Sequence, residues 1–207
     1  MSSRFPILVV AAALAIPAVP PLVSPAFAQS PRDWPSPSSA PQSSRAGTSF
    51  SLDTLFGALK LAPDEASAKA IEDRIWAMWN SSDSDTCNLL MSRVKDATDD
   101  KDYDLAIKLL DSIVAIKPDY VEAWNQRATI YYLNHEYGRA LADIREVLAR
   151  EPRHFGALAG LGLILQDIGD DKHALQAYEA ALAIDPHLRN VPDMVKTLRE
   201  KVEGRDI

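Results

Sequence analysis

The feature that most constrains the fold of this 207-residue chain is a 34-residue repeat in its second half. Pro118, Pro152 and Pro186 are spaced by that interval, and the chemistry of the other columns agrees when the chain is aligned in this register. A fixed period of this length is typical of small structural units that stack into an array. The register predicts three units, which are 87–120, 121–154 and 155–188.

Each unit predicts two amphipathic helices joined by a tight polar turn. Apolar residues recur at three- and four-residue spacing through about 14 residues, and again through about 14 more after the turn. Each repeated proline falls in the connector to the next unit, where it ends a helix without a steric clash. Small side chains at the eighth and twentieth positions let the two helices approach: Val94, Ala128 and Gly162, then Ala106, Ala140 and Ala174.

A helix–turn–helix period of this length, with small residues at positions 8 and 20 and proline at 32, resembles the tetratricopeptide repeat (TPR). The unit 121–154 carries the most matches, with Trp124, Ala128, Tyr131, Ala140, Ile144, Val147 and Pro152 in register. The chain as a whole resembles small exported TPR proteins of alphaproteobacteria. The resemblance implies an all-α fold, an α-solenoid of TPR repeats, and a role in protein–protein interaction.

The flanks of the repeats are predicted to be helical as well. Residues 51–86 are expected to form an N-terminal helical pair, a degenerate repeat that caps the amino end of the array. Residues 189–207 are expected to form a C-terminal capping helix and tail, because an end repeat needs a polar-backed neighbour. Trp76 and Trp79 are interpreted as core of the first pair, with an exposed partner-binding pair as the alternative.

The amino terminus predicts export. Residues 1–28 have a basic start, an apolar core and an Ala-Phe-Ala ending, which is typical of a signal peptide cleaved between Ala28 and Gln29. Several prolines interrupt the apolar run and argue against a membrane anchor. There is no cysteine near the cleavage point, so a lipoprotein is not expected. Residues 29–50 form a Pro/Ser-rich segment predicted to be a disordered linker. The mature protein is therefore expected in the periplasm.

Composition and motifs argue against several functions. The formal charge of −7, with the acidity after the linker, disfavours a nucleic-acid partner. Cys87 is the sole cysteine and the four histidines are scattered, so no metal site, cofactor or catalytic residue is predicted. The sequence predicts a non-enzymatic module that binds another protein or peptide segment. The alternative is a self-assembling structural or scaffold component of the cell envelope, since a homo-oligomer is possible.

The family resemblance places partner binding on the concave face, which the first helix of each repeat lines. Transferred position by position, it implies these partner-binding residues: Asn88, Met91, Lys95, Glu122, Asn125, Gln126, Thr129, Tyr132, Gly156, Ala159, Leu163 and Gln166. Met91, Lys95 and Gln126 replace residues with which chaperone-binding members clamp a carboxylate, so such a clamp is not expected. Gly156 predicts a shallow apolar floor with room for a bulky side chain or a helix. Close helix packing at the glycines is the alternative.

Overall fold

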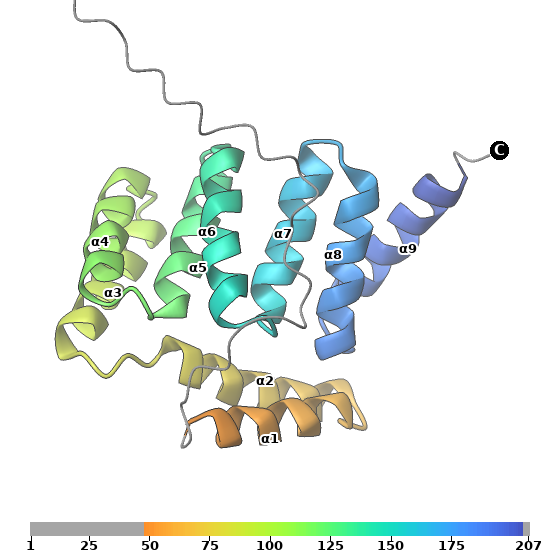
Figure 1. Ribbon diagram of the computed structural model, residues 1–207, viewed down its shortest axis with the longest axis horizontal. Helices are drawn as coiled ribbons and strands as arrows, with labels where there is room; N and C mark the ends of the chain where they lie inside the picture. The colour runs from red at the N-terminus through yellow and green to blue at the C-terminus, as the bar shows by residue number, and fades with distance from the viewer. Residues whose placement is uncertain (1–47, 205–207) are drawn as a thin grey trace, which may run out of the picture. The chain divides into compact units, whose positions relative to one another are not determined.

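The computed structural model describes residues 48–204, with side chains from Leu52 onward. The predicted signal peptide, the cleavage point between Ala28 and Gln29 and the linker up to residue 47 lie outside this range. Within it the chain forms nine helices and no strand, which confirms the all-α prediction, and no helix there is long and apolar enough to cross a membrane. The helices (Figure 1) are α1 (Thr48–Lys60), α2 (Glu65–Asn80), α3 (Asp85–Asp99), α4 (Tyr103–Ile116), α5 (Val121–Leu133), α6 (Tyr137–Arg150), α7 (Phe155–Asp167), α8 (Asp171–Ile184) and α9 (Val191–Glu203).

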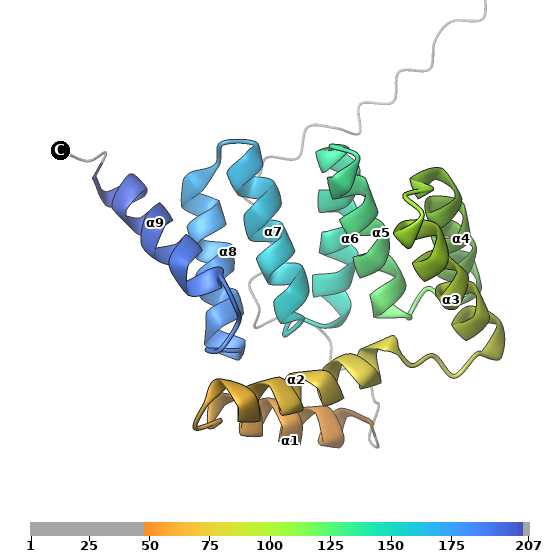
Figure 2. The same cartoon turned by 180° about the vertical axis from the view of Figure 1, so that it is seen from behind.

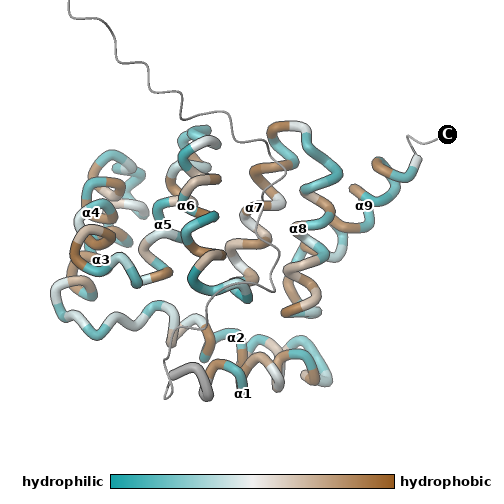
Figure 3. Tube along the Cα trace, viewed as in Figure 1, coloured by the Kyte–Doolittle hydropathy of each residue, from teal (hydrophilic) through white to brown (hydrophobic). Residues whose placement is uncertain are grey.

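Helices α3 to α8 form three stacked helical hairpins, one for each predicted repeat. Within a repeat the two helices pack on each other, and the second helix also packs on the first helix of the next unit (Figures 1 and 2). Hydrophobic and hydrophilic residues alternate along these helices (Figure 3), as amphipathic packing requires. At Gly162 a Cβ atom would lie 2.5 Å from the Tyr178 ring, so the eighth position of the third repeat has no room for a larger residue. Helix α9 packs on α8 as the predicted C-terminal capping helix.

The turn inside each repeat uses one left-handed residue, and these residues are again 34 apart. Lys101, His135 and Gly169 have φ values of 60°, 58° and 86°. The following N–H reaches back to the helix that has just ended, as in the bond from Asp102 to the Ala97 carbonyl at 2.8 Å. Only Gly169 marks this geometry in the sequence, because lysine and histidine rarely adopt it.

The pair α1–α2 does not stack on the first repeat, which corrects the prediction that residues 51–86 form a degenerate repeat capping the amino end. It lies along the edge formed by the connectors between repeats, where α2 contacts α5 and α1 contacts α8 (Figures 1 and 2). In the repeat register, Lys60 and Glu72 would stand at the two positions that need small residues. A stacked arrangement would therefore bury two charged side chains between helices. Helix α1 also begins at Thr48, three residues before the expected boundary.

The final residue of every repeat contacts this helix pair. The Tyr120 hydroxyl donates to the Asn80 carbonyl at 2.7 Å. The His154 ring stacks on Trp79 with centroids 4.0 Å apart and an angle of 9°. Leu188 packs against the apolar cluster that α1 and α2 form. One register position thus provides three successive contacts along the connector edge.

Gly156 provides a direct test of how α2 is held. A Cβ atom there would lie 2.7 Å from Cη2 of Trp76, whereas at Gly160 the nearest atom, in Ile144, would be 3.8 Å away. We expect Gly156→Ala to destabilise the protein by about 1–3 kcal/mol, because the indole or the helix must shift. Gly160→Ala, the matched control, should be neutral or stabilising, since alanine favours a helix. Urea unfolding of both variants measures this, and equal stabilities would contradict the contact.

A pair of carboxyl groups lies between α2 and the end of α8. Asp185 is fully buried and its Oδ2 has no hydrogen-bond partner within the described residues. Burial, followed by the charge of Asp185, raises the pKa of the half-buried Glu72. A raised pKa means that the folded state favours the protonated form of Glu72, which can donate to Asp185. The nearby charge of Lys69 lowers the pKa of Glu72, and that of Asp73 raises it.

We therefore expect the stabilisation from the Glu72–Asp185 contact to be present below about pH 4.5 and lost as the pH rises through the raised pKa of Glu72. Glu72→Gln keeps a neutral donor at every pH, so it should be more stable than the wild type at pH 7, by about 0.5–1 kcal/mol. The difference should vanish near pH 4. Thermal unfolding across this range measures it, with Glu65→Gln on the exposed start of α2 as the control. A constant difference would show that no proton is shared.

Candidate protein-binding groove

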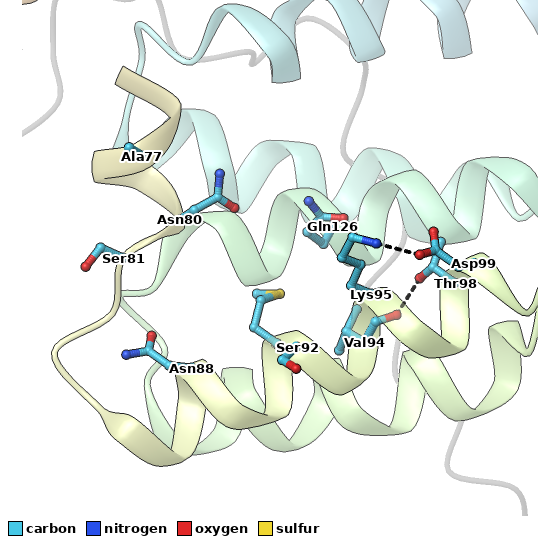
Figure 4. Close-up of a pocket in the computed structure, with 11 residues that line it drawn as sticks. Ala77, Asn80, Ser81, Asn88, Ser92, Val94, Lys95, Thr98, Asp99 and Gln126 are labelled. Atoms are coloured by element: carbon cyan, nitrogen blue, oxygen red, sulfur yellow. Dashed lines mark hydrogen bonds and ion pairs between the residues drawn. The ribbon is translucent and has the colours of Figure 1, made fainter. Parts of the chain in front are cut away.

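A pocket of about 670 Å³ opens on the face lined by the first helices of repeats 1 and 2. Figure 4 shows it between the carboxyl end of α2, one face of α3, and Gln126 of α5. Four predicted partner-binding residues, Asn88, Met91, Lys95 and Gln126, are brought together here. Ser92 and Thr98 of α3 also line it.

The pocket combines apolar walls with several polar side chains, and it presents no uncompensated cation among its lining residues. Lys95 Nζ lies 2.5 Å from Asp99 Oδ2, and this hydrogen bond raises the pKa of Lys95. Asn88 donates to and accepts from the backbone of Ser82. A clamp for a carboxylate needs cationic donors that are free to reach it. The arrangement therefore suits neutral or hydrogen-bonding groups.

Glu122 lies inside the protein, which corrects its prediction as a partner contact. It is 0% exposed and accepts hydrogen bonds from Asn125 at 3.2 Å and Gln126 at 2.7 Å. His154 Nε2 lies 3.3 Å from its other oxygen, while His154 Nδ1 accepts the N–H of Ala157. The imidazole therefore carries its proton on Nε2 and donates it to Glu122. Glu122 and Asn125 form a buried network that orients Gln126 at the pocket.

The predicted third-repeat residues do not join the pocket. Gly156 lies under Trp76, so the space expected there for a bulky side chain is filled by the protein itself. Ala159 and Leu163 are half-buried and pack against the cluster of α8 and α9. This part of the concave face is therefore occupied by helix packing.

The remaining predicted residues lie nearer the turns. Thr129 is exposed, and its hydroxyl donates to the Asn125 carbonyl. Gln166 accepts a hydrogen bond from the Tyr178 hydroxyl at 3.2 Å. Tyr132 is half-buried, and burial followed by a hydrogen bond with Asp167 raises its pKa. These residues form a second region, separate from the pocket.

Trp79 is a core residue and Trp76 packs, partly buried, against the same apolar cluster, so the two indoles are not an exposed pair. Trp79 is 7% exposed and packs against Phe56 and Phe155. Trp76 meets Phe155 edge-on at 5.5 Å. The two indoles fasten α2 to the connector edge.

Sequence reasoning missed the wall that α2 contributes to the pocket, at Ala77, Asn80 and Ser81. The polar run that follows Trp79 was the only available signal, and it also fits an ordinary helix end. Their role depends on where the helix pair docks, which the repeat register does not predict. No group of three acidic, histidine or cysteine side chains within residues 48–204 could hold a metal ion.

Comparison with known proteins agrees with this geometry. The family model of the tetratricopeptide repeat matches residues 125–188. The first TPR of Spaghetti (RPAP3) bound to an HSP90 peptide superposes with a TM-score of 0.56 at 17% identity, covering 58% of this chain and 96% of that one. The Sgt2 TPR domain from Aspergillus fumigatus gives 0.56 at 24% identity, covering 59% and 83%. These two structures share the fold.

A TPR repeat-containing protein of Rhizobium etli is similar in sequence over a longer stretch. It is 42% identical over 153 residues, which cover 74% of this chain and 75% of that protein. Identity of this extent, together with three stacked helical hairpins in the repeat register, shows that the chain belongs to the tetratricopeptide repeat family.

Proposed function

We propose that this chain is a non-enzymatic protein-interaction module that binds a segment of another protein on its concave face. The observation that carries the proposal is the pocket between α2, α3 and α5, which gathers Asn88, Met91, Lys95 and Gln126. A concave site with apolar walls and a few convergent polar groups is the usual form of a binding site. Met91 supplies an adaptable apolar surface, and Gln126 supplies an oriented amide.

The partner segment differs in kind from an acidic carboxyl-terminal tail. The Spaghetti (RPAP3) repeat is bound to an HSP90 peptide, which supports peptide binding as a use of this fold. In this chain, however, Lys95 is neutralised by Asp99 and the pocket has no second cation. A terminal carboxylate would lose its hydration there without gaining a charged partner. We therefore favour an internal, neutral or basic segment.

We also propose that the protein works in the periplasm. The basic start, apolar core and Ala-Phe-Ala ending of residues 1–28 support export by signal peptide. In a Gram-negative bacterium, protein recovered from the periplasmic fraction should begin at Gln29. Replacing Ala28 with a bulky residue should leave the precursor uncleaved. Amino-terminal sequencing gives the result, and a mature protein that begins at Met1 would contradict export by this route.

Self-assembly is the second candidate, and one observation favours it. The outer face of the first repeat is left uncovered by α1–α2, and three large apolar residues are exposed on this repeat. Leu89, Leu105 and Ile116 are 58%, 45% and 54% exposed. The residues equivalent to Leu89 in the next repeats, Ala123 and Ala157, are fully buried. End-to-end association at this face would bury Leu89 as stacking buries Ala123 and Ala157.

The partner-binding proposal is tested with peptides selected from a displayed random library against the full chain. Titration of a selected synthetic peptide should show at least about a tenfold loss of affinity in Ser92→Trp, which fills the pocket. Ser112→Trp, at an exposed serine of α4, is the matched control and should bind within about twofold of the wild type. Equal binding by both variants would place the peptide elsewhere. If no peptide is selected and sedimentation shows mass rising with concentration, self-assembly is the better function.

A further inference from the structure

Three aromatic side chains and one carboxylate meet at the turn edge between repeats 2 and 3. The Tyr137 hydroxyl donates to Asp167 Oδ2 at 3.3 Å and lies 3.0 Å from His135 Nδ1. The rings of Tyr132 and Tyr137 have centroids 6.1 Å apart. Asp167 also contributes to the raised pKa of Tyr132, after burial. We call Tyr132, His135, Tyr137 and Asp167 the turn-edge cluster. Tyr132 is also one of the residues predicted to line the concave face, so the cluster adjoins the predicted partner-binding residues.

Asp167 holds a negative charge where the fold does not compensate it. It is the last residue of α7, and the carboxyl end of a helix favours a cation. Asp99 holds the same register position at the end of α3, where Lys95, four residues earlier, neutralises it. In the third repeat the residue four before Asp167 is Leu163. Among the described residues, no lysine or arginine forms an ion pair with Asp167.

Asp167 also contributes to the pKa of the tyrosines around it. Burial, followed by Asp167, raises the pKa of Tyr137. Burial, followed by Tyr132 and Asp167, raises the pKa of Tyr178 to about 12. The phenols therefore remain protonated and present hydroxyls and ring faces around a carboxylate.

Elsewhere in this protein, carboxylates and aromatic rings together hold an arginine side chain. Arg127 bonds Asp143 at 2.8 Å and Asp111 at 2.6 Å. Its guanidinium also lies 4.9 Å from the ring centroid of Trp124 and 5.9 Å from that of Tyr131. A cation between carboxylates and aromatic faces combines charge-assisted hydrogen bonds with cation–π attraction. The turn-edge cluster has the carboxylate and the rings of that arrangement.

We propose that the turn-edge cluster receives an arginine or lysine side chain of the partner segment, with Asp167 as its counter-ion and the Tyr132 and Tyr137 rings beside it. This inference rests on the proposed function and specifies a basic residue in the partner. Leu133 and Ile168, at the ends of α5 and α7, are 44% and 49% exposed and offer apolar surface to the methylene stem. The net acidity of the chain attracts a basic segment over longer distances.

The test uses the isotope-labelled full chain and two blocked pentapeptides, one with a central arginine and one with its neutral isostere citrulline, flanked by alanines. The arginine peptide should shift the amide signals of Tyr132, Tyr137 and Asp167 in NMR spectra and bind about tenfold more tightly than the citrulline peptide. Asp167→Asn should abolish this preference. Asp99→Asn, at the equivalent position of the first repeat, should preserve it.

Equal binding of the two peptides, or a preference that survives Asp167→Asn, would overturn the inference. That failure leaves the proposed function intact, because pocket binding is tested separately with Ser92→Trp. Conversely, an arginine preference that depends on Asp167 supports the cluster even if the displayed library yields no pocket ligand. The two proposals can therefore fail independently.

Discussion

The stacking of Trp79 on His154 is the contact on which the α2 wall of the pocket depends. It joins α2 to the connector between repeats 2 and 3. Glu122 holds the imidazole of His154 in place through a hydrogen bond to its Nε2 atom. Glu122 in turn binds the amide of Gln126, which lines the pocket. One buried network therefore sets both the position of the pocket wall and the orientation of a pocket side chain.

The repeats could be predicted from the sequence because their determinants are local and recur. Proline in the connector, small residues where helices cross and apolar residues at helical spacing each act within one unit, so the period reveals them. The docking of α1–α2 has no such signal. Two tryptophans on a helix fit an exposed interface as well as a core, and only the three-dimensional meeting with His154 and Phe155 distinguishes the two. The available signal against stacking was the presence of Lys60 and Glu72 at the two register positions that are small in the repeats.

Of the positions transferred by register, those of the first repeat line the pocket, whereas others in the later repeats are buried by packing outside the register. Asn88, Met91 and Lys95 line the pocket as the alignment implies. Gly156 occupies the position equivalent to Asn88, yet Trp76 covers it, and Glu122 at the same position is fully buried beside His154. An alignment assigns the direction of a side chain relative to its own helix. It does not predict whether a helix outside the repeats packs over that side chain.

Differences between equivalent positions are the more informative part of a repeat sequence. Position 13 is aspartate in the first and third repeats, but the residue four before it is Lys95 in one and Leu163 in the other. The first aspartate is thereby neutralised within its own helix, and the second is left beside two tyrosines at a helix end. Packing within the array requires neither arrangement, since leucine occupies this position in the second repeat. A carboxylate that accepts the Tyr137 hydroxyl but pairs with no lysine or arginine of the described residues supports the proposal of a ligand that carries the opposite charge.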